Sequence, residues 1–392
     1  MLIRILTMFL LLTSSVFAVD WAKQAEEDAK QDKIVLAFDG VMPNRMVCDT
    51  VPRVLPDGRI ALYFLAGGNR EPSPENYIGV IYSNDNGDTW SKLEPVNIGF
   101  PRSGNTIGQG PTEVLVVDNR ITMFFATHAK SWDTSWRSWT AVSEDNGKTW
   151  QKPQPLPGRL EAATFIRPYI ITQDKRIVIP FQHYLGKLDN QNFDVVKQNR
   201  DNPEPYPTPV INSRNGVLIS QDGGKTWSEH GNIRCPIPDN THLWAEPTIV
   251  EPVKDRIVML IRPVGRGTFL YKAESNDGGL TWLDVAEVTD IPNPSSKTAL
   301  FLLAENTVAL LHNPNSHHRS PMALWISFDG MKTWAYKRVI VAESVDGPKG
   351  SLNYPEGYVS ADRQWLNFAF DNNRHQAVFV RAKLPPLPKT SE

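Results

Sequence analysis

The sequence contains very little cysteine. Its 392 residues include only Cys48 and Cys235, which lie far apart, so no disulfide is predicted and whether they pair stays open. The eight histidines are scattered, and neither an HExxH nor a CxxC motif occurs. The sequence therefore predicts neither a transition-metal site nor another cofactor.

An excess of one charge is also lacking. Lys and Arg total 41 against 43 Asp and Glu, which gives a net charge of −2. A near-neutral chain offers no electrostatic reason to expect a nucleic-acid partner. Hydrophobic residues make up 41% of the chain, which is enough to bury a large core.

Long hydrophobic runs are scarce, and the main one stands at the N-terminus. Residues 1–18 read MLIRILTMFLLLTSSVFA, with Arg4, an apolar run and a small residue at the end. This pattern predicts a secretory signal peptide cleaved after Ala18, and hence a secreted or periplasmic protein. No later segment reaches about 18 apolar residues, so no membrane insertion is expected after cleavage.

An octapeptide of the form S-x-D-x-G-x-T-W is abundant instead. The five copies are Ser83–Trp90, Ser143–Trp150, Ser220–Trp227, Ser275–Trp282 and Ser327–Trp334, the last with Met331 in the glycine position. Asp can accept a hydrogen bond from the backbone two residues on, Gly permits positive φ, and Trp provides an apolar anchor. The octapeptide therefore predicts a strand-turn-strand scaffold element.

A second repeat consists of an apolar run, a polar turn and another apolar run. Its six copies are residues 52–64, 112–125, 167–181, 246–261, 297–312 and 356–370. Each copy is typical of a β-hairpin. Six hairpins predict an all-β fold, a six-bladed β-propeller with four-stranded antiparallel blades and octapeptide turns.

The two ends of the chain are expected to complete one blade. The sixth hairpin is followed by a strand at residues 375–383 and no octapeptide, so residues 34–38 are the simplest fourth strand. The prediction is one domain, 33–384, with a helix or flexible leader at 19–32 and a tail at 385–392. The polar segment 185–216 is expected to be a surface loop near the site entrance.

Several inner strands are expected to begin with charged or polar residues. Counting back from each hairpin turn gives the positions Asp49, Gly110, Ile166 or Arg167, Glu246, Lys297 and Tyr354. Burying charge is costly unless the charge is paired, so this set predicts a polar cleft at the centre of the propeller.

The octapeptide is the Asp-box, or BNR repeat, and five copies resemble the sialidase (neuraminidase) superfamily. The segment from Trp244 to Glu251 is similar to the sialidase strand that carries the catalytic glutamate, which maps to Glu246. The next strand of the family carries an arginine that binds the substrate carboxylate, and it maps to Arg262. These roles are implied by the resemblance.

The resemblance continues in the last two blades. The segment Asn313-Pro314-Asn315 followed by Arg319 looks like the family's region for another carboxylate-binding arginine. Tyr354 matches the family's nucleophilic tyrosine, and Asp371 matches an acid near the end of the following strand.

The first blade departs from the family pattern. Sialidases carry an arginine where this chain has Cys48 or Asp49, and neither Arg45 nor Arg53 fits the register. Arg167 and Lys297 are candidates for the missing positive charge. Arg70 lies where the family has a further substrate arginine, and Glu75 or Glu71 is expected to be the general acid, with Glu75 preferred.

The resulting prediction is a monomeric exo-glycosidase of the sialidase type that removes a terminal acidic sugar, most simply sialic acid, by means of a Tyr/Glu pair. A neutral tyrosine nucleophile avoids the repulsion between a carboxylate nucleophile and the acidic substrate. Two alternatives stay open: a hydrolase or lyase acting on another acidic glycan, such as a uronic acid, and a non-catalytic carbohydrate-binding propeller.

Overall fold

The computed structural model describes residues 19–99, 107–128, 136–185, 211–238, 244–265 and 267–387. The predicted signal peptide, residues 186–210 of the predicted loop at 185–216 and the last five residues of the tail lie outside this range. The two ends of that predicted loop, residue 185 and residues 211–216, belong to strands instead. Within the described residues, no helix is both long and apolar enough to cross a membrane.

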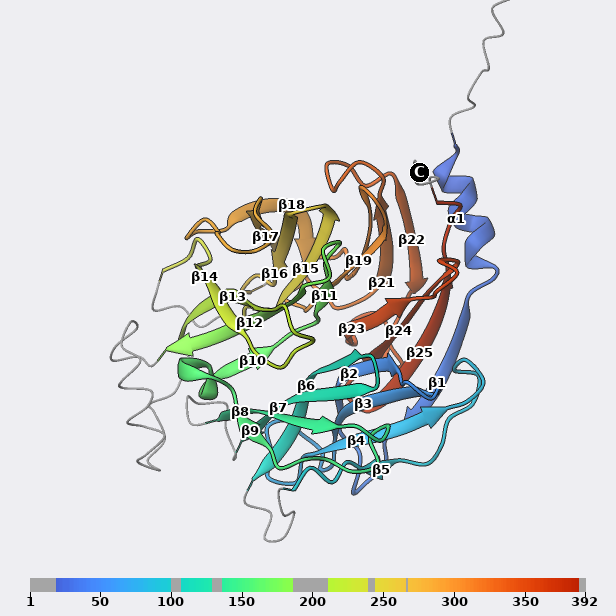
Figure 1. The fold of residues 1–392 in the computed structure, drawn as a ribbon. Helices are drawn as coiled ribbons and strands as arrows, with labels where there is room; N and C mark the ends of the chain where they lie inside the picture. Colours follow the sequence, from blue (N-terminus) through green and yellow to red (C-terminus); the bar gives the residue numbers. More distant parts are fainter. Residues whose placement is uncertain are drawn as a thin grey trace, which may run out of the picture.

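Six antiparallel sheets are arranged as blades around a central axis (Figure 1). Blade one is β2 (Val47–Val54), β3 (Ile60–Ala66), β4 (Tyr77–Ser83) and β5 (Glu94–Pro95); blade two is β6 (Gly108–Val117), β7 (Arg120–His128), β8 (Arg137–Ser143) and β9 (Gln154–Pro155). Blade three is β10 (Thr164–Ile166) and β11 (Ile170–Ile171), β12 (Ile177–Leu185), β13 (Ile211–Ser220) and β14 (Ser228–Ile233), preceded by a 3₁₀ turn at Gly158–Glu161.

The remaining blades follow the same order from the axis outward. Blade four is β15 (Pro247–Val253), β16 (Arg256–Ile261), β17 (Thr268–Ser275) and β18 (Glu287–Asn293); blade five is β19 (Ala299–Ala304), β20 (Thr307–His312), β21 (Met322–Ser327) and β22 (Tyr336–Val341). Blade six is β23 (Leu352–Val359), β24 (Trp365–Asn372), β25 (Gln376–Lys383) and β1 (Lys33–Asp39). The predicted six-bladed propeller is confirmed.

The closure of the ring is also as predicted. The N-terminal strand β1 pairs antiparallel with β25, from Lys33 opposite Arg381 to Asp39 opposite Gln376. In Figure 1 the first strand, in blue, lies beside the last strands, in red. This pairing covers the edge of β25, which would otherwise present unpaired backbone groups to solvent.

The apolar core is divided among the six junctions between neighbouring blades. Each of the six largest clusters of buried apolar side chains draws its residues from two adjacent blades; one cluster joins Val51 and Tyr63 of blade one to Val114 and Phe125 of blade two. Alternating residues of each strand face opposite neighbours, so every sheet is buried on both faces. This packing holds the inner strands in fixed positions around the axis.

Residues 19–32, for which a helix and a flexible leader were both open, contain helix α1 (Trp21–Ala29). Trp21 stacks on Phe328 with ring centroids 4.2 Å apart, and the Tyr336 hydroxyl donates to the Asp28 carboxylate at 2.9 Å. The helix is therefore docked on blade five rather than free.

The Asp-box turns share one hydrogen-bond pattern. In Ser275–Trp282, the Asp277 carboxylate accepts from the Thr281 backbone N–H at 2.9 Å and from its hydroxyl at 2.6 Å, while the Gly279 N–H donates to the Ser275 hydroxyl. Met331 has φ of +72° and donates its N–H to Ser327 as the glycines do. The turn geometry thus survives without glycine at this position.

Candidate active site

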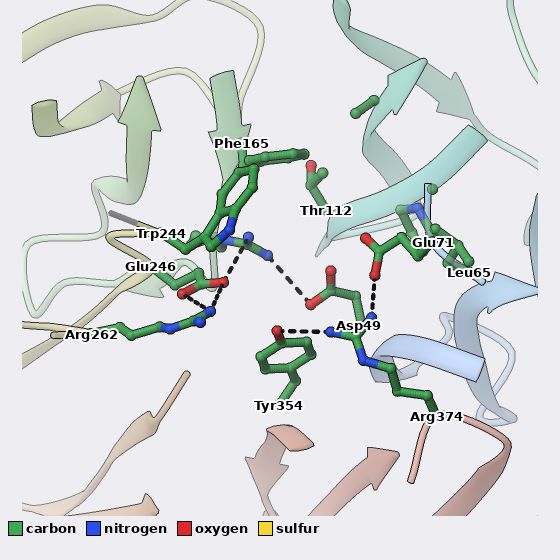
Figure 2. A pocket seen from close by; sticks show the side chains of 14 residues that line it. Asp49, Leu65, Glu71, Thr112, Phe165, Trp244, Glu246, Arg262, Tyr354 and Arg374 are labelled. Carbon is green, nitrogen blue, oxygen red and sulfur yellow. Dashed lines mark hydrogen bonds and ion pairs between the residues drawn. The ribbon is translucent and has the colours of Figure 1, made fainter. Parts of the chain in front are cut away.

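One pocket opens at the axis, where several blades present polar side chains (Figure 2). The residues that line it are Asp49, Leu65, Glu71, Gly110, Pro111, Thr112, Ala126, Phe165, Arg167, Trp244, Glu246, Arg262, Tyr354 and Arg374. Of the six inner-strand positions predicted to face the centre, all line this pocket except Lys297, and in the third blade Arg167 takes the place rather than Ile166.

Backbone irregularities turn two of these side chains toward the axis. The register of β2 against β3 shifts between Cys48 and Val51, and Asp49 within this shift has φ of +49°. The register of β23 against β24 shifts in the same way after Asn353, and Tyr354 has φ of +53°. A non-glycine residue with positive φ is strained, and such strain is concentrated at functional sites.

The Tyr354 side chain is surrounded by cations. Nη2 of Arg374 donates to its hydroxyl at 3.2 Å, and the guanidinium carbon of Arg319 lies 5.2 Å from the ring centroid. Nζ of Lys297 lies 5.7 Å from the same centroid. This surrounding charge suits an anionic ligand bound beside the tyrosine.

Glu246 and Arg262 form a buried ion pair. Nη1 of Arg262 donates to both carboxylate oxygens at 2.7 Å, and Nη2 of Arg167 lies 3.9 Å from the same carboxylate. Burial alone would lower the pKa of Arg262, but the adjacent Glu246 carboxylate raises it, so the guanidinium stays charged. Among the described contacts there is no direct hydrogen bond between Glu246 and Tyr354.

Asp49 lies at the floor of the pocket between two cations. Its Oδ1 accepts from Nη1 of Arg167 at 3.4 Å and from Nζ of Lys297 at 3.3 Å. Burial raises the pKa of Asp49. The positive charges of Lys297 and Arg167 act more strongly in the opposite direction, so the pKa lies below its ordinary value. Asp49 is therefore an anion at neutral pH and unsuited to donate a proton.

The first-blade arginines do not reach the pocket. Arg53 is buried below it and donates to the carboxylates of Glu113 and Glu356, and Lys297 lies 3.5 Å from Glu356. Arg45 is exposed at the surface. Neither residue replaces the missing family arginine, because Arg53 is fully engaged in buried ion pairs and Arg45 points to solvent.

Several predicted site residues lie outside the pocket lining. Arg319 and Lys297 lie beside the Tyr354 ring, and Lys297 is only 1% exposed. Asp371 is fully buried; it accepts from the Asn353 amide at 2.7 Å and from the Arg374 backbone N–H at 2.9 Å. Asp371 thus supports the residue before Tyr354 instead of facing a ligand.

The loop after β3 also differs from the expectation. Glu75 and Arg70 are exposed and do not line the pocket, whereas Glu71 does. Glu71 pairs with Arg374 through a 2.7 Å contact between Oε2 and Nη1. The structure thus brings Glu71, and not the preferred Glu75, to the pocket, because the loop turns Glu71 inward.

Three pocket residues had no signal in the sequence pattern. Arg374 stands in the turn between β24 and β25, far from any inner-strand start, and Phe165 and Trp244 form an aromatic wall opposite it (Figure 2). Trp244 is the first residue of the segment that carries Glu246, but nothing in the sequence pattern assigned it to the pocket.

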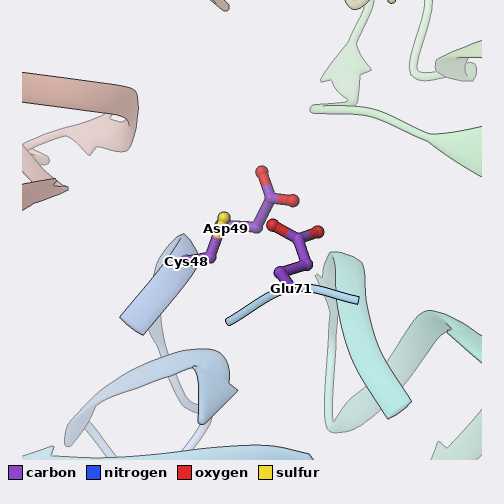
Figure 3. A group of neighbouring side chains, drawn as sticks. All are labelled: Cys48, Asp49 and Glu71. Atoms are coloured by element: carbon purple, nitrogen blue, oxygen red, sulfur yellow. The ribbon is translucent and has the colours of Figure 1, made fainter. Parts of the chain in front are cut away.

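Cys48, Asp49 and Glu71 bring one sulfur and two carboxylates within 4.8 Å of one another (Figure 3). Arg374 already makes contacts with two members of this group: its Nη1 lies 2.7 Å from Glu71 Oε2 and 3.7 Å from the Cys48 sulfur. Burial raises the pKa of Cys48 well above its ordinary value, which disfavours the thiolate that metals bind. Cys48 and Cys235 are both free thiols, so they do not pair.

Comparison with known proteins shows the family to which the chain belongs. Residues 105–364 match the BNR repeat-like domain, and residues 81–92, which contain the whole first octapeptide, match the BNR/Asp-box repeat. The first match covers well over half of the chain. The chain belongs to the BNR repeat-like family. It is a BNR propeller of the sialidase superfamily, as the octapeptides predicted.

Individual relatives of this BNR propeller are distant. A sialidase from Bacteroides fragilis (strain YCH46) is 24% identical over 346 residues, which are 80% of this chain and 57% of that protein. The structure of Hadza microbial sialidase Hz136 superposes with a TM-score of 0.65 and 19% identity over 86% of this chain and 66% of that one. The structure of Trypanosoma rangeli sialidase superposes with a TM-score of 0.62 and 16% identity, over 89% of this chain and 59% of that one.

A protein of unknown function from Dyadobacter fermentans DSM 18053 has a TM-score of 0.65 and 18% identity, over 90% of this chain and 98% of that one. By contrast, the match to the B. fragilis sialidase covers only 57% of the length of that protein. At these identities the solved structures support the shared propeller fold.

Proposed function

We propose that this chain is a sialidase-like exo-glycosidase that removes a terminal acidic sugar, with sialic acid as the leading substrate. The observation that carries the proposal is the Tyr354 hydroxyl at the pocket, within 3.2 Å of Arg374 and in one cavity with Glu246 and Arg262. Planar guanidinium groups suit a carboxylate ligand, and a tyrosine oxygen suits attack on a carbon that carries one.

The reaction begins with attack by the Tyr354 oxygen on the anomeric carbon. The bond from that carbon to the leaving oxygen breaks, and Glu71 donates a proton to the leaving oxygen. The Tyr354 proton passes to Glu246. Water then cleaves the tyrosyl–sugar bond in the reverse sense and restores both carboxyl groups. Glu71 takes the acid role in this proposal because it lines the pocket, whereas Glu75 is exposed.

Arg262 has a second role in the same scheme. In the free protein it donates to both oxygens of Glu246 at 2.7 Å. A substrate carboxylate competes for this guanidinium and so frees Glu246 to accept the tyrosine proton. Arg319, which donates to Ser295 and Asn353 beside the tyrosine ring, holds this side of the pocket in place.

The aromatic wall fits a sugar as well. Phe165 and Trp244 line the pocket opposite Arg374, so the apolar face of a pyranose can pack on them while its carboxylate faces the arginines (Figure 2). An apolar wall combined with convergent charged groups is typical of a small-ligand site. We further propose export of the protein, on the basis of the signal-peptide pattern in residues 1–18.

A panel of fluorogenic glycosides tests the proposal. Wild-type protein, Tyr354→Phe and a peripheral control, Arg159→Ala, are assayed with α-sialosides, α- and β-uronides and neutral hexosides. We expect turnover of an acidic glycoside by wild type and Arg159→Ala, and its loss in Tyr354→Phe. Turnover of uronides alone would replace sialic acid by a uronic acid. No turnover of any glycoside would leave the carbohydrate-binding alternative.

A further inference from the structure

Arg374 differs from the other two arginines that line the pocket. It stands in the turn between β24 and β25 with φ of +59° rather than at an inner strand. Its side chain is 38% exposed, against 4% for Arg167 and 7% for Arg262. Arg374 is therefore the pocket arginine that an incoming ligand meets first.

The contacts of Arg374 place its charge next to the reactive oxygen. Nη2 donates to the Tyr354 hydroxyl at 3.2 Å, and the guanidinium carbon lies 5.6 Å from the ring centroid. A carboxylate attached to the carbon that Tyr354 attacks must lie beside this oxygen. It would therefore fall within hydrogen-bond reach of Nη2, while Nη1 keeps its contact with Glu71 at 2.7 Å.

Cys48 leaves the space that this guanidinium occupies. Its sulfur is fully buried and lies 3.7 Å from Nη1 of Arg374. A long side chain at this position on β2 would compete for the same volume. A short residue in the first blade thus leaves room for the long side chain of Arg374, which lines the pocket from the sixth blade.

We infer that Arg374 binds the substrate carboxylate together with Arg262, and thereby sets the preference of the pocket for acidic over neutral sugars. This inference rests on the proposed function. On binding, Nη2 of Arg374 moves its hydrogen bond from the Tyr354 oxygen to the carboxylate. This exchange leaves the tyrosine oxygen free to attack.

The test compares an acidic ligand with its uncharged form. Binding of 2-deoxy-2,3-didehydro-N-acetylneuraminic acid and of its methyl ester is measured by calorimetry for wild type, Arg374→Ala and Arg374→Lys. We expect Arg374→Ala to weaken binding of the acid by about tenfold to a hundredfold and to leave binding of the ester nearly unchanged. Arg374→Lys keeps the charge but loses the planar fork, so it should be intermediate.

Two controls separate ligand binding from a structural role. Glu71→Gln removes the ion-pair partner of Arg374 but keeps the guanidinium, so the preference for the acid should persist. Arg381→Ala changes an arginine of the same blade that stacks on Trp365 instead, and it should behave as wild type.

The inference is overturned if Arg374→Ala retains the wild-type preference for the acid. It is also overturned if Glu71→Gln loses that preference to the same extent, because Arg374 would then act only by fixing the loop. Wild-type protein that binds neither compound would overturn the proposed sialic-acid specificity and the inference with it.

Discussion

Asp49 and Asp371 are two nearby carboxyl groups whose surroundings shift their pKa values in opposite directions. Asp49 faces Lys297 and Arg167, and they hold its pKa below the ordinary value against the effect of burial. Asp371 is fully enclosed, and burial raises its pKa to about 7, although Arg374 and Asn353 act in the opposite direction. One residue is thus a fixed anion of the pocket floor, and the other titrates near neutrality.

Asp371 makes the stability of the protein depend on pH. The folded pKa of about 7 lies above the ordinary value of 3.8, so the folded state holds this proton more tightly. The resulting stabilisation is fully present below pH ~4 and is lost as the pH rises through 7. Asp371→Asn mimics the protonated form. It should flatten the dependence of the unfolding free energy on pH between 5 and 8, by about 1 kcal/mol or more.

Urea unfolding of wild type and Asp371→Asn at several pH values measures this effect. The same pH dependence in both proteins would show that another group is responsible. Asp290→Asn, an exposed aspartate of β18, is the matched control and should leave the profile unchanged.

Glu246 should affect turnover more than folding. Glu246→Gln keeps an oxygen that can accept from Arg262 but removes the proposed proton acceptor of Tyr354. We expect kcat on the best acidic glycoside to fall by about 10²–10⁴-fold. Circular dichroism should stay close to wild type, whereas the unfolding temperature should fall, because Arg262 loses the charge of its buried partner. A kcat within tenfold of wild type would exclude Glu246 as the base.

At the scale of single elements, the Asp-boxes fix the outer turns and leave the inner strand ends to the site. No residue of an octapeptide lines the pocket. The hydrogen bonds of the box lower the pKa of Asp277 to about 2 although burial opposes them, so the turn is held by an anion over the whole physiological range. Scaffold and site therefore occupy different parts of each blade.

Removal of one box carboxylate should reduce stability without changing the chemistry. Asp277→Ala loses the two hydrogen bonds from Thr281, and we expect the unfolding free energy to fall by about 1–2 kcal/mol. Turnover at 25 °C should be unchanged. Denaturant unfolding and the glycoside assay check the two statements, with Asp290→Ala as a control. A loss of turnover in folded Asp277→Ala would contradict the separation of scaffold and site.

The elements also show where sequence reasoning succeeds. The hairpin turns fix where each inner strand begins, so Asp49, Gly110, Glu246 and Tyr354 could be placed at the centre from spacing alone. In the third blade the spacing left Ile166 or Arg167 open, and in the fifth it gave Lys297, which lies outside the pocket lining. Arg374 could not, because it reaches the pocket from the tip of a hairpin. Glu71 and Glu75 could not be separated, because the loop after β3 has no periodic pattern. The burial of Arg53 depends on Glu113 and Glu356, which approach only after the blades close.

At the scale of the whole molecule, the ring holds together residues that are more than a hundred positions apart in the sequence. Closure by β1 keeps blade six against blade one, and this junction sets Tyr354 and Arg374 against Asp49 and Glu71. The site is therefore a property of the closed ring. Opening the ring should disturb the pocket and expose a strand edge at once.

Deletion of residues 19–39 removes α1 and β1 and leaves β25 unpaired. We expect the unfolding temperature to fall by about 10 °C or more, with concentration-dependent association through the exposed edge. Deletion of 19–29 alone keeps β1 and should have a smaller effect. Calorimetry and light scattering measure both changes. Equal stability of the longer deletion and wild type would show that β1 is not needed for closure.

The central claim is that Tyr354 becomes covalently bonded to an acidic sugar. The most direct measurement is peptide mass spectrometry after incubation with 2,3-difluorosialic acid. Its fluoride at carbon 2 is the leaving group, and its fluorine at carbon 3 slows release of a covalent intermediate. The account predicts one added sugar on the peptide that contains Tyr354 and none on the same peptide of Tyr354→Phe. A sugar bonded to Glu246 or Glu71, or no adduct in a protein that turns over sialosides, would contradict it.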